Sequence, residues 1–210
     1  MQRSLDDYIL QHSQPEPDYL KRIARETYVK MMNPRMISGY TQGCLLKMFC
    51  RMIRPKQVVE IGTFTGYGTL WLAAGMSDDA RLHTIEINDE LEDTIRSNLK
   101  TSPHEKRIIL HIGDAIQIIP TLEGTFDMAF IDGNKRYYRE YYEALMPKIS
   151  AGGFILADNT LWGEKVVENL THGDRQTRAV LNFNAIVAQD SRVEALIIPL
   201  RDGLSIIRKK

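Results

Sequence analysis

Three oxygen-bearing side chains stand at the ends of two apolar segments. Asp132 follows "MAFI", and Asp158 with Asn159 follows "FILA". Two carboxylates and an amide oxygen are hard ligands, which suit Mg²⁺, Ca²⁺ or Mn²⁺ better than zinc. Three protein ligands leave about half of a six-coordinate shell open to two adjacent substrate hydroxyls and water. Two ordinary turns are the alternative interpretation, because Asp-Asn is a common turn dipeptide.

A glycine-rich turn lies earlier, in the segment "VVEIGTFTGYGTLWLAAGM". Its glycines are Gly62, Gly66 and Gly68, and no lysine follows them. The segment therefore has neither the dinucleotide pattern G-x-G-x-x-G nor the triphosphate pattern G-x-x-x-x-G-K-[ST]. The free N–H groups at the start of the next helix favour an anion. A ligand with a carboxylate and no phosphate suits this turn.

Two acids after the following strands indicate a nucleoside site. Glu86 ends the next apolar segment, roughly two dozen residues after the turn, where an acid is well placed to bind ribose hydroxyls. Asp114, after the third segment, can accept a hydrogen bond from an exocyclic amine. A nucleoside joined to an amino acid without phosphate describes S-adenosylmethionine.

The order of the apolar segments indicates which elements position these residues. Strands are expected at Val58–Ile61, Leu82–Ile87, Ile108–Ile112, Met128–Ile131 and Phe154–Ala157, with helices near Gly66–Met76, Glu90–Leu99, Ala115–Leu122 and Lys135–Ile149. Such alternation predicts a parallel sheet with right-handed crossovers. The carboxyl ends of its strands would bring the acids and the glycine turn to one edge.

Both ends of the chain depart from this alternation. Helices at about Asp18–Met32 and Tyr40–Ile53 precede the first strand, and residues 1–35 form a helical extension. After a helix at Arg175–Gln189, the strands "RVEALIIPL" and "GLSIIRKK" flank the turn "RDG" and form an antiparallel pair. We expect one α/β domain over residues 1–210: a Rossmann-like, seven-stranded mixed sheet, its last strand antiparallel, with helices on both faces.

The composition is that of a soluble globular protein, with 43% hydrophobic and 26% charged residues. The formal net charge is zero, which counts against a large polyanionic partner. The N-terminus lacks the apolar core of a signal peptide, and no apolar run approaches the length of a membrane span. Cys44 and Cys50 fall on nearly opposite faces of one helix, as is typical of reduced thiols. We expect a cytoplasmic protein without a membrane partner.

Six segments carry a family resemblance: "EIGTFTGY", "TIEIN", "GDA", "FIDGNKRYY", "ADNTLW" and "IPLRDGLSIIRK". In this order, they resemble the class I S-adenosylmethionine-dependent methyltransferases. Among these, the chain is similar to the metal-dependent catechol and caffeoyl-coenzyme A O-methyltransferases of bacterial type, from about Met36 to Lys209. The resemblance implies a single methyltransferase domain that uses S-adenosylmethionine and a divalent cation, with Mg²⁺ favoured over Ca²⁺ or Mn²⁺.

The resemblance also implies contacts to the cofactor from the loop before the second helix, the glycine turn and the ends of the next strands. These residues are Met36, Ser38, Glu60, Gly62, Thr63, Gly66, Tyr67, Gly68, Glu86, Ile87, Asp114, Ala115 and Asp132. Within this set, Glu60 and the glycine turn surround the methionine part of the cofactor. Glu86 binds the ribose, and Asp114 and Ala115 flank the adenine.

By the same resemblance, Asp132, Asp158 and Asn159 bind the metal, and Lys135 and Asp132 are catalytic, with Lys135 accepting the proton. Without the resemblance, a solvated lysine at a helix start would be the simpler interpretation of Lys135. A lysine beside a cation and away from bulk water has its neutral form favoured. A phenol with a pKa near 10 is mostly protonated at neutral pH, and a bound divalent cation lowers a hydroxyl pKa by several units.

Two positions depart from the family pattern. Gly68 stands where relatives commonly have a hydroxyl residue, so that one hydrogen bond to the cofactor is lost, worth about 0.5–1.5 kcal/mol. Asn134 stands where the family usually has the second acid of Asp-Ala-Asp-Lys. One negative charge near the cation is thereby removed, which weakens metal binding or changes the preferred cation.

The implied acceptor is a small hydroxylated aromatic molecule with adjacent hydroxyls, such as a catechol. Methylation of a wobble 5-hydroxyuridine in tRNA is the main alternative, and a non-catalytic binding module on this fold is a third. Trp162 and Tyr138 match aromatic positions of the family, although a Trp that caps the sheet and a buried Tyr would explain them equally. The family also implies a homodimer, in which the N-terminal helix either forms the contact or closes the active site.

Overall fold

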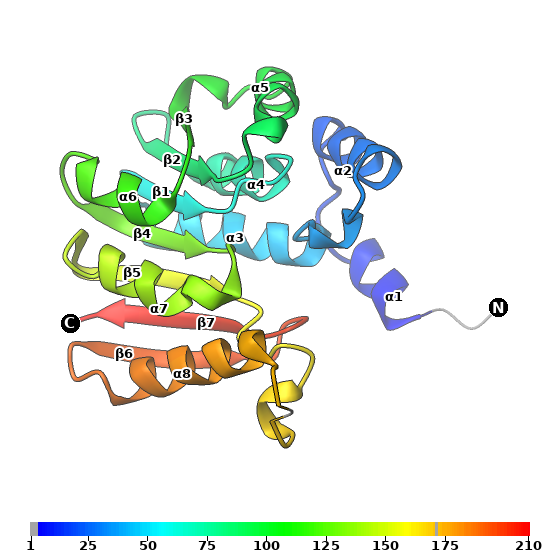
Figure 1. Ribbon diagram of the computed structural model, residues 1–210. Helices are drawn as coiled ribbons and strands as arrows, with labels where there is room; N and C mark the ends of the chain where they lie inside the picture. The colour runs from blue at the N-terminus through cyan, green and yellow to red at the C-terminus, as the bar shows by residue number, and fades with distance from the viewer. Residues whose placement is uncertain (1–3, 171) are drawn as a thin grey trace.

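The centre of the computed structural model is one sheet of seven strands in the order β3-β2-β1-β4-β5-β7-β6 (Figure 1). The structure describes residues 4–170 and 172–210, so that residues 1–3 of the expected extension and residue 171 lie outside the described residues. The strands are β1 (Gln57–Ile61), β2 (Arg81–Glu86), β3 (Ile108–Ile112), β4 (Phe126–Ile131), β5 (Ile149–Asp158), β6 (Val193–Ile198) and β7 (Leu204–Lys209).

Strands β1 to β5 run parallel to one another, and β7 runs antiparallel to both β5 and β6. The expected mixed sheet with an antiparallel last strand is therefore confirmed. After β1, the chain adds β2 and β3 on one side and β4 with the later strands on the other. Open α/β sheets bind their ligands at the carboxyl ends of the strands beside such a reversal, here between β1 and β4.

Helices cover both faces because adjacent strand residues point to opposite sides of the sheet. Val58 and Leu82 pack against α3 and α4 on one face, whereas Val59 and Ile85 pack against α6, α7 and α8 on the other. The helices from α3 to α8 have the following bounds: α3 (Tyr40–Ile53), α4 (Tyr67–Gly75), α5 (Glu92–Lys100), α6 (Ala115–Ile118), α7 (Tyr138–Leu145) and α8 (Arg175–Gln189).

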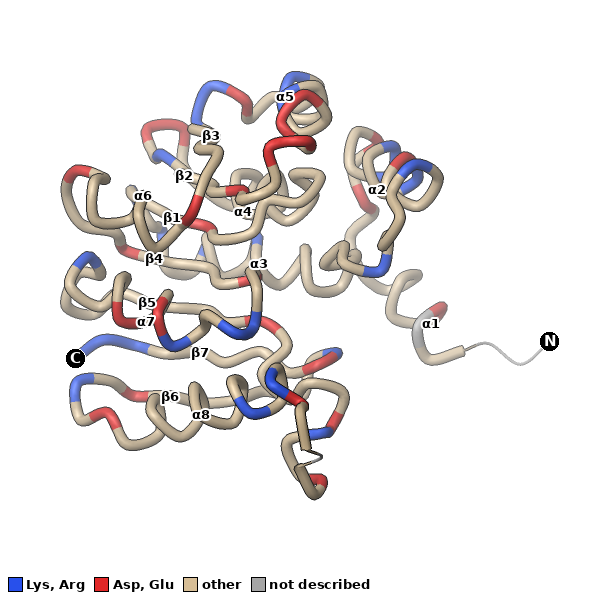
Figure 2. Tube along the Cα trace, in the orientation of Figure 1, with Lys and Arg blue, Asp and Glu red and all other residues tan. Residues whose placement is uncertain are grey.

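The N-terminal extension packs on helices rather than on the sheet. Its main helix α2 (Asp18–Lys30) buries Leu20 and Ile23 in a cluster with residues of α4 and α5. Both α2 and α5 carry Lys or Arg together with Asp or Glu, so these helices have mixed charge (Figure 2). The short helix η1 (Pro34–Met36) then leads towards the carboxyl ends of the strands.

Several elements differ from the sequence expectation. Strand β4 begins at Phe126 rather than Met128, and the helix expected at Ala115–Leu122 is α6 followed by a 3-10 turn, η4 (Ile119–Thr121). The helix expected at Lys135–Ile149 is a 3-10 turn, η5 (Lys135–Tyr137), followed by α7, which ends at Leu145. Strand β5 begins at Ile149 rather than Phe154, because Ile149 pairs with Phe126 despite the intervening glycines, which are rare in strands. The helix α1 (Leu5–Gln11) lies within the expected helical extension, although no separate helix was predicted there. A capping box at Ser4 begins it.

None of the described helices has the length and apolarity needed to cross a membrane. Cys44 and Cys50 are both free thiols.

A close helix contact brings α3 onto α4. A methyl group added at Gly43 of α3 would lie 2.2 Å from Cδ1 of Trp71 in α4, and the Trp71 side chain is fully buried. The indole ring therefore fills the space that any other residue at position 43 would require.

We predict that Gly43→Ala lowers the free energy of unfolding by about 1–3 kcal/mol, the usual cost of overpacking a core. This loss would exceed the gain of about 1 kcal/mol that Ala brings to a helix interior. Urea denaturation would measure it, with Thr41→Ala on the exposed side of the same helix as the control. Equal stability of the Gly43→Ala and wild-type proteins would contradict the prediction.

Candidate active site

The carboxyl ends of β1 to β5 border a cleft of about 1160 Å³. Pockets for one small molecule are typically about 300–1000 Å³, so the cleft has room for a cofactor and an acceptor together. The segment from Met31 to Met36 forms one wall, with Met32 and Met36 largely exposed. Of the predicted site residues, the cleft is lined by Met36, Gly62, Glu86, Ile87, Ala115, Asp132, Lys135, Asn159 and Trp162.

A second cavity of about 10 Å³, roughly the space of one water molecule, adjoins the cleft. It is lined by the predicted residues Met36, Ser38, Glu60, Gly62, Thr63, Tyr67, Gly68 and Asp132. The remaining predicted residues, Gly66, Asp114 and Asp158, line neither space. Asp114 caps α6 through Oδ1, which accepts a hydrogen bond from the N–H of Ile116, and its neighbours Gly113 and Ala115 line the cleft.

Gly62 brings the two halves of the site into contact. It has φ of 97°, and a Cβ atom at this position would lie 2.3 Å from the carbonyl oxygen of Asp132. The N–H of Asp132 donates to the carbonyl oxygen of Ile61, 2.8 Å away. Only glycine permits this approach, which places the turn after β1 directly against the end of β4.

Glu60 is buried at the end of β1, with 1% of its surface exposed. Its Oε2 atom accepts hydrogen bonds from the hydroxyls of Thr69 and Thr84, at 2.5 and 2.6 Å. Burial raises the pKa of Glu60 to about 8, and these two hydrogen bonds lower it in part. Glu60 is therefore an acid that holds its proton near neutral pH unless a cationic group approaches it.

Gly68 stands between Glu60 and Ser38. A Cβ atom at position 68 would lie 3.2 Å from the Ser38 hydroxyl and 3.3 Å from Oε1 of Glu60. The missing side chain thus leaves open the small cavity between these two groups. Thr69, the next residue along α4, donates its hydroxyl to Glu60.

Glu86 is oriented by the backbone at the end of β2. One carboxylate oxygen accepts from the N–H of Phe64 at 2.8 Å, and the other from the N–H of Asn88 at 2.9 Å. Phe64 has φ of 52°, which turns its N–H towards the acid. Each carboxylate oxygen keeps a free acceptor site, so Glu86 can still bind a pair of hydroxyls in the cleft.

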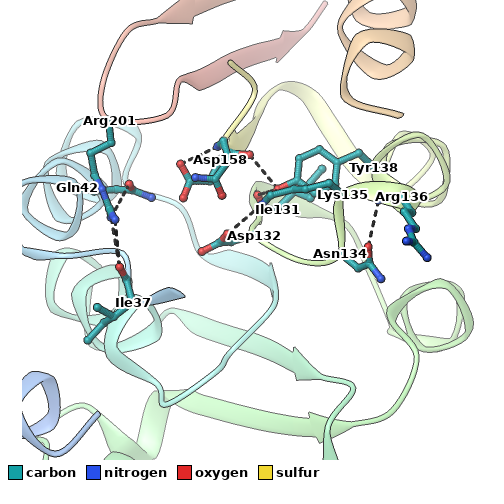
Figure 3. A network of polar contacts seen from close by, with 11 residues as sticks. Ile37, Gln42, Ile131, Asp132, Asn134, Lys135, Arg136, Tyr138, Asp158 and Arg201 are labelled. Carbon is teal, nitrogen blue, oxygen red and sulfur yellow. Dashed lines mark hydrogen bonds and ion pairs between the residues drawn. The ribbon is translucent and has the colours of Figure 1, made fainter. Parts of the chain in front are cut away.

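Two strand-end carboxylates and a lysine lie together at the ends of β4 and β5 (Figure 3). Asp158 is buried, and its Oδ1 accepts from the N–H of Asn159, which has φ of 56°. Burial raises the pKa of Asp132, the adjacent Lys135 lowers it, and the negative charge of Asp158 raises it. The described residues contain no cluster of three or more His, Cys, Asp or Glu side chains that could bind a metal. The predicted metal ligands are two acids, Asp132 and Asp158, and the amide of Asn159.

Lys135 is held by Tyr138. Its Nζ donates to the Tyr138 hydroxyl at 2.5 Å and lies 3.3 Å from Oδ1 of Asp132. The Tyr138 hydroxyl in turn donates to the carbonyl oxygen of Asp158 at 2.9 Å. With 7% of its surface exposed, Lys135 is a buried lysine at the cleft and not the solvated one that the sequence also allowed.

Several contributors to the site were not found from the sequence. The wall residues from Met31 to Arg35 carry no motif, and Phe64 contributes through its main chain, which sequence patterns do not report. Arg201 lowers the pKa of Asp132 although it belongs to the hairpin between β6 and β7. The one available signal was its position in the turn "RDG", at the same edge of the sheet.

The fold and cleft define a class: a Rossmann-like methyltransferase sheet with its ligand site at the strand reversal. The O-methyltransferase family model matches residues 10–210. Caffeoyl-CoA O-methyltransferase from Stellaria longipes is 30% identical, covering 98% of this chain and 90% of the relative. Tricin synthase 2 from Oryza sativa subsp. japonica is 33% identical over 83% of this chain, and the match spans 63% of the rice protein.

A solved structure gives the same result in three dimensions. The O-methyltransferase TomG from Streptomyces achromogenes, in complex with SAM, superposes with a TM-score of 0.91 at 28% identity, covering 98% of this chain and 96% of TomG. The chain belongs to the O-methyltransferase family and is an S-adenosylmethionine-dependent O-methyltransferase of the caffeoyl-CoA O-methyltransferase type. The resemblance seen in the sequence is thus confirmed.

We predict that Glu60 makes the free energy of unfolding fall with rising pH. Its folded pKa of about 8 exceeds the ordinary value of 4.5, so the stability that the protonated acid provides is present below pH 4.5 and is lost as the pH approaches 8. Relative to Glu60→Gln, the wild-type protein should lose more than about 1.4 kcal/mol, the equivalent of one pKa unit. Urea denaturation between pH 5 and 8 measures this, and parallel pH curves for the two proteins would refute it.

Proposed function

We propose that this enzyme transfers the methyl group of S-adenosylmethionine to a hydroxyl of a small catechol-like acceptor, assisted by a divalent cation at Asp132, Asp158 and Asn159. The observation that carries the proposal is the pair of neighbouring carboxylates beside buried Lys135, at a cleft large enough for two small molecules. An aromatic acceptor with adjacent hydroxyls would lie against Trp162 and the methionine wall, the segment from Met31 to Met36.

The chemistry of the donor set fits a hard cation. The negative charge of Asp158 raises the pKa of Asp132, and a bound cation would offset this repulsion. Three oxygen ligands favour Mg²⁺, with Ca²⁺ or Mn²⁺ as alternatives. When bound, such a cation lowers the pKa of an acceptor hydroxyl and orients it.

The residues of the chain then divide the remaining work. Lys135 takes the hydroxyl proton at Nζ. The Tyr138 hydroxyl lies 2.5 Å from this nitrogen and holds it in place. The small cavity has room for only one small group, and the acid of Glu60 on its lining complements the charged amine of the cofactor. Glu86 suits the ribose, and Ile87 and Ala115 supply apolar surface for the adenine. Alignment of donor and acceptor in one cleft supplies much of the rate enhancement.

The N-terminal segment supports two further proposals. Its η1 region lines the cleft, so it covers the bound cofactor. Leu5 and Tyr8 of α1 expose 75% and 52% of their surface, which favours a homodimer in which α1 packs on the second copy.

We predict a dimeric mass in light scattering. Replacing Leu5 and Tyr8 by Ser should shift that mass towards the monomer, because the apolar surface that drives association is removed. A wild-type protein that stays monomeric at micromolar concentration would contradict the proposed dimer.

We predict that Asp158→Asn reduces methyl transfer at least about 100-fold while cofactor affinity changes less than about twofold, because Asp158 lines neither cavity. Labelled cofactor, Mg²⁺ and a panel of catechols would measure transfer, with calorimetry for binding. The matched control is Asp78→Asn, whose side chain is fully exposed.

Two outcomes of this assay would count against the proposal. Full activity in EDTA would reject the metal role. Methylation of 5-hydroxyuridine in tRNA with every catechol inert would replace the acceptor. Lys135→Met should abolish turnover while cofactor affinity is kept, and an active Lys135→Met enzyme would reject Lys135 as the base.

A further inference from the structure

The turn between β6 and β7 contains a residue in an unfavourable conformation. Arg201 has φ of 50°, in the left-handed region that non-glycine residues seldom adopt. The turn is closed by a hydrogen bond from the N–H of Gly203 to the carbonyl oxygen of Leu200, 2.9 Å long. Glycine would fit this position without strain, so the presence of arginine indicates that its side chain is needed.

The Arg201 side chain reaches a segment 164 residues away in the sequence (Figure 3). Its Nη1 and Nη2 both donate to the carbonyl oxygen of Ile37 at 3.3 Å, and Nη1 also donates to Oε1 of Gln42 at 3.3 Å. Ile37 and Gln42 are both buried. A Cβ atom at Gly39 would lie 3.4 Å from Nη1, so the loop lies directly on the guanidinium.

The contacted loop borders the site on both sides of Ile37. Met36 lines the cleft and the small cavity, and Ser38 lines the small cavity. The loop has no regular structure, because η1 ends at Met36 and α3 begins at Tyr40. In the described part of the chain, the backbone hydrogen bonds of residues 36–39 stay within residues 33–43, apart from those that Arg201 donates.

The other side of the same turn holds the loop after β5. The N–H of Thr160 donates to the carbonyl oxygen of Gly203 at 3.1 Å, and that of Leu161 donates to the carbonyl oxygen of Asp202 at 2.8 Å. Trp162 follows directly and lines the cleft. The turn is therefore anchored to one wall of the site while its arginine reaches the other.

We infer that Arg201 is a positioning residue for the cofactor: it fixes the loop from Met36 to Ser38 against the cleft by binding the backbone of Ile37. Arg201 itself lines neither cavity, so it acts through this loop. The inference rests on the proposed function in one respect, the placement of the cofactor beside Met36 and Ser38. It does not depend on the metal or on the acceptor.

The test is Arg201→Gly, with affinity for S-adenosylmethionine and S-adenosylhomocysteine measured by calorimetry without metal or acceptor. The expected Kd rises by about three- to tenfold, the loss of one or two hydrogen bonds. The midpoint of urea denaturation should fall, because the buried acceptors of Ile37 and Gln42 lose their donors, but the protein should stay folded under the calorimetric conditions, because glycine accepts this backbone conformation. Arg201→Lys should recover only part of the affinity, because lysine lacks the forked donors.

Arg54→Gly is the matched control. Arg54 is an exposed arginine with φ of 53° at the end of α3, so the substitution gives the same backbone change away from the site. Its cofactor affinity should equal that of the wild-type protein. In a methyl-transfer assay, Arg201→Gly should raise the KM for the cofactor by a similar factor.

The outcomes separate this inference from the proposed function. Equal cofactor Kd values for Arg201→Gly, Arg54→Gly and the wild-type protein would overturn the role of Arg201. A loss of affinity for Arg201→Gly that appears only where the protein is partly unfolded would also overturn it, since a purely structural role predicts that result. A wild-type enzyme that binds cofactor but methylates no catechol would reject the proposed acceptor and leave the affinity comparison valid.

Discussion

The contact between Gly62 and the backbone of Asp132 is the constraint on which the rest of the site depends. Strands β1 and β4 are neighbours at the strand reversal, and the hydrogen bond from Asp132 to Ile61 holds their ends together. Because no side chain intervenes, the cofactor turn and the candidate metal ligand share one boundary. A methyl donor and an activated hydroxyl can meet only if their binding groups are this close.

Electrostatics follows from the same closeness. Glu60, Asp132 and Asp158 are acids withdrawn from solvent within one region, and burial raises the pKa of Glu60 and of Asp132. Lys135 supplies one compensating positive charge, held by Tyr138. The site therefore has more acidic than basic groups, and cationic ligands would reduce the repulsion between them. This is expected of a site for a sulfonium cofactor and a metal ion.

Much of this arrangement follows from the sequence. Apolar segments separated by helical patterns predicted the sheet, and strand-end residues such as Asp132 and Glu86 were placed correctly at its edge because parallel strands share a carboxyl end. The start of β5 was missed because two glycines weaken a strand pattern that pairing with Phe126 overrides. Arg201 was missed because its role depends on a contact 164 residues away, which no local spacing reports. The helix cap that Asp114 provides through Oδ1 was not predicted, and its role at the cofactor stays a prediction.

The methionine wall opposite this rigid edge has a different character. Met31, Met32 and Met36 are unbranched and polarisable, so their side chains can adapt to molecules of different outline. The strand-end groups facing them are fixed by backbone hydrogen bonds and by burial. If the proposed acceptor is correct, discrimination would rest on the position of its reacting oxygens, because the methionines adapt to the rest of the molecule. Close analogues with altered ring substituents would then compete for the same pocket.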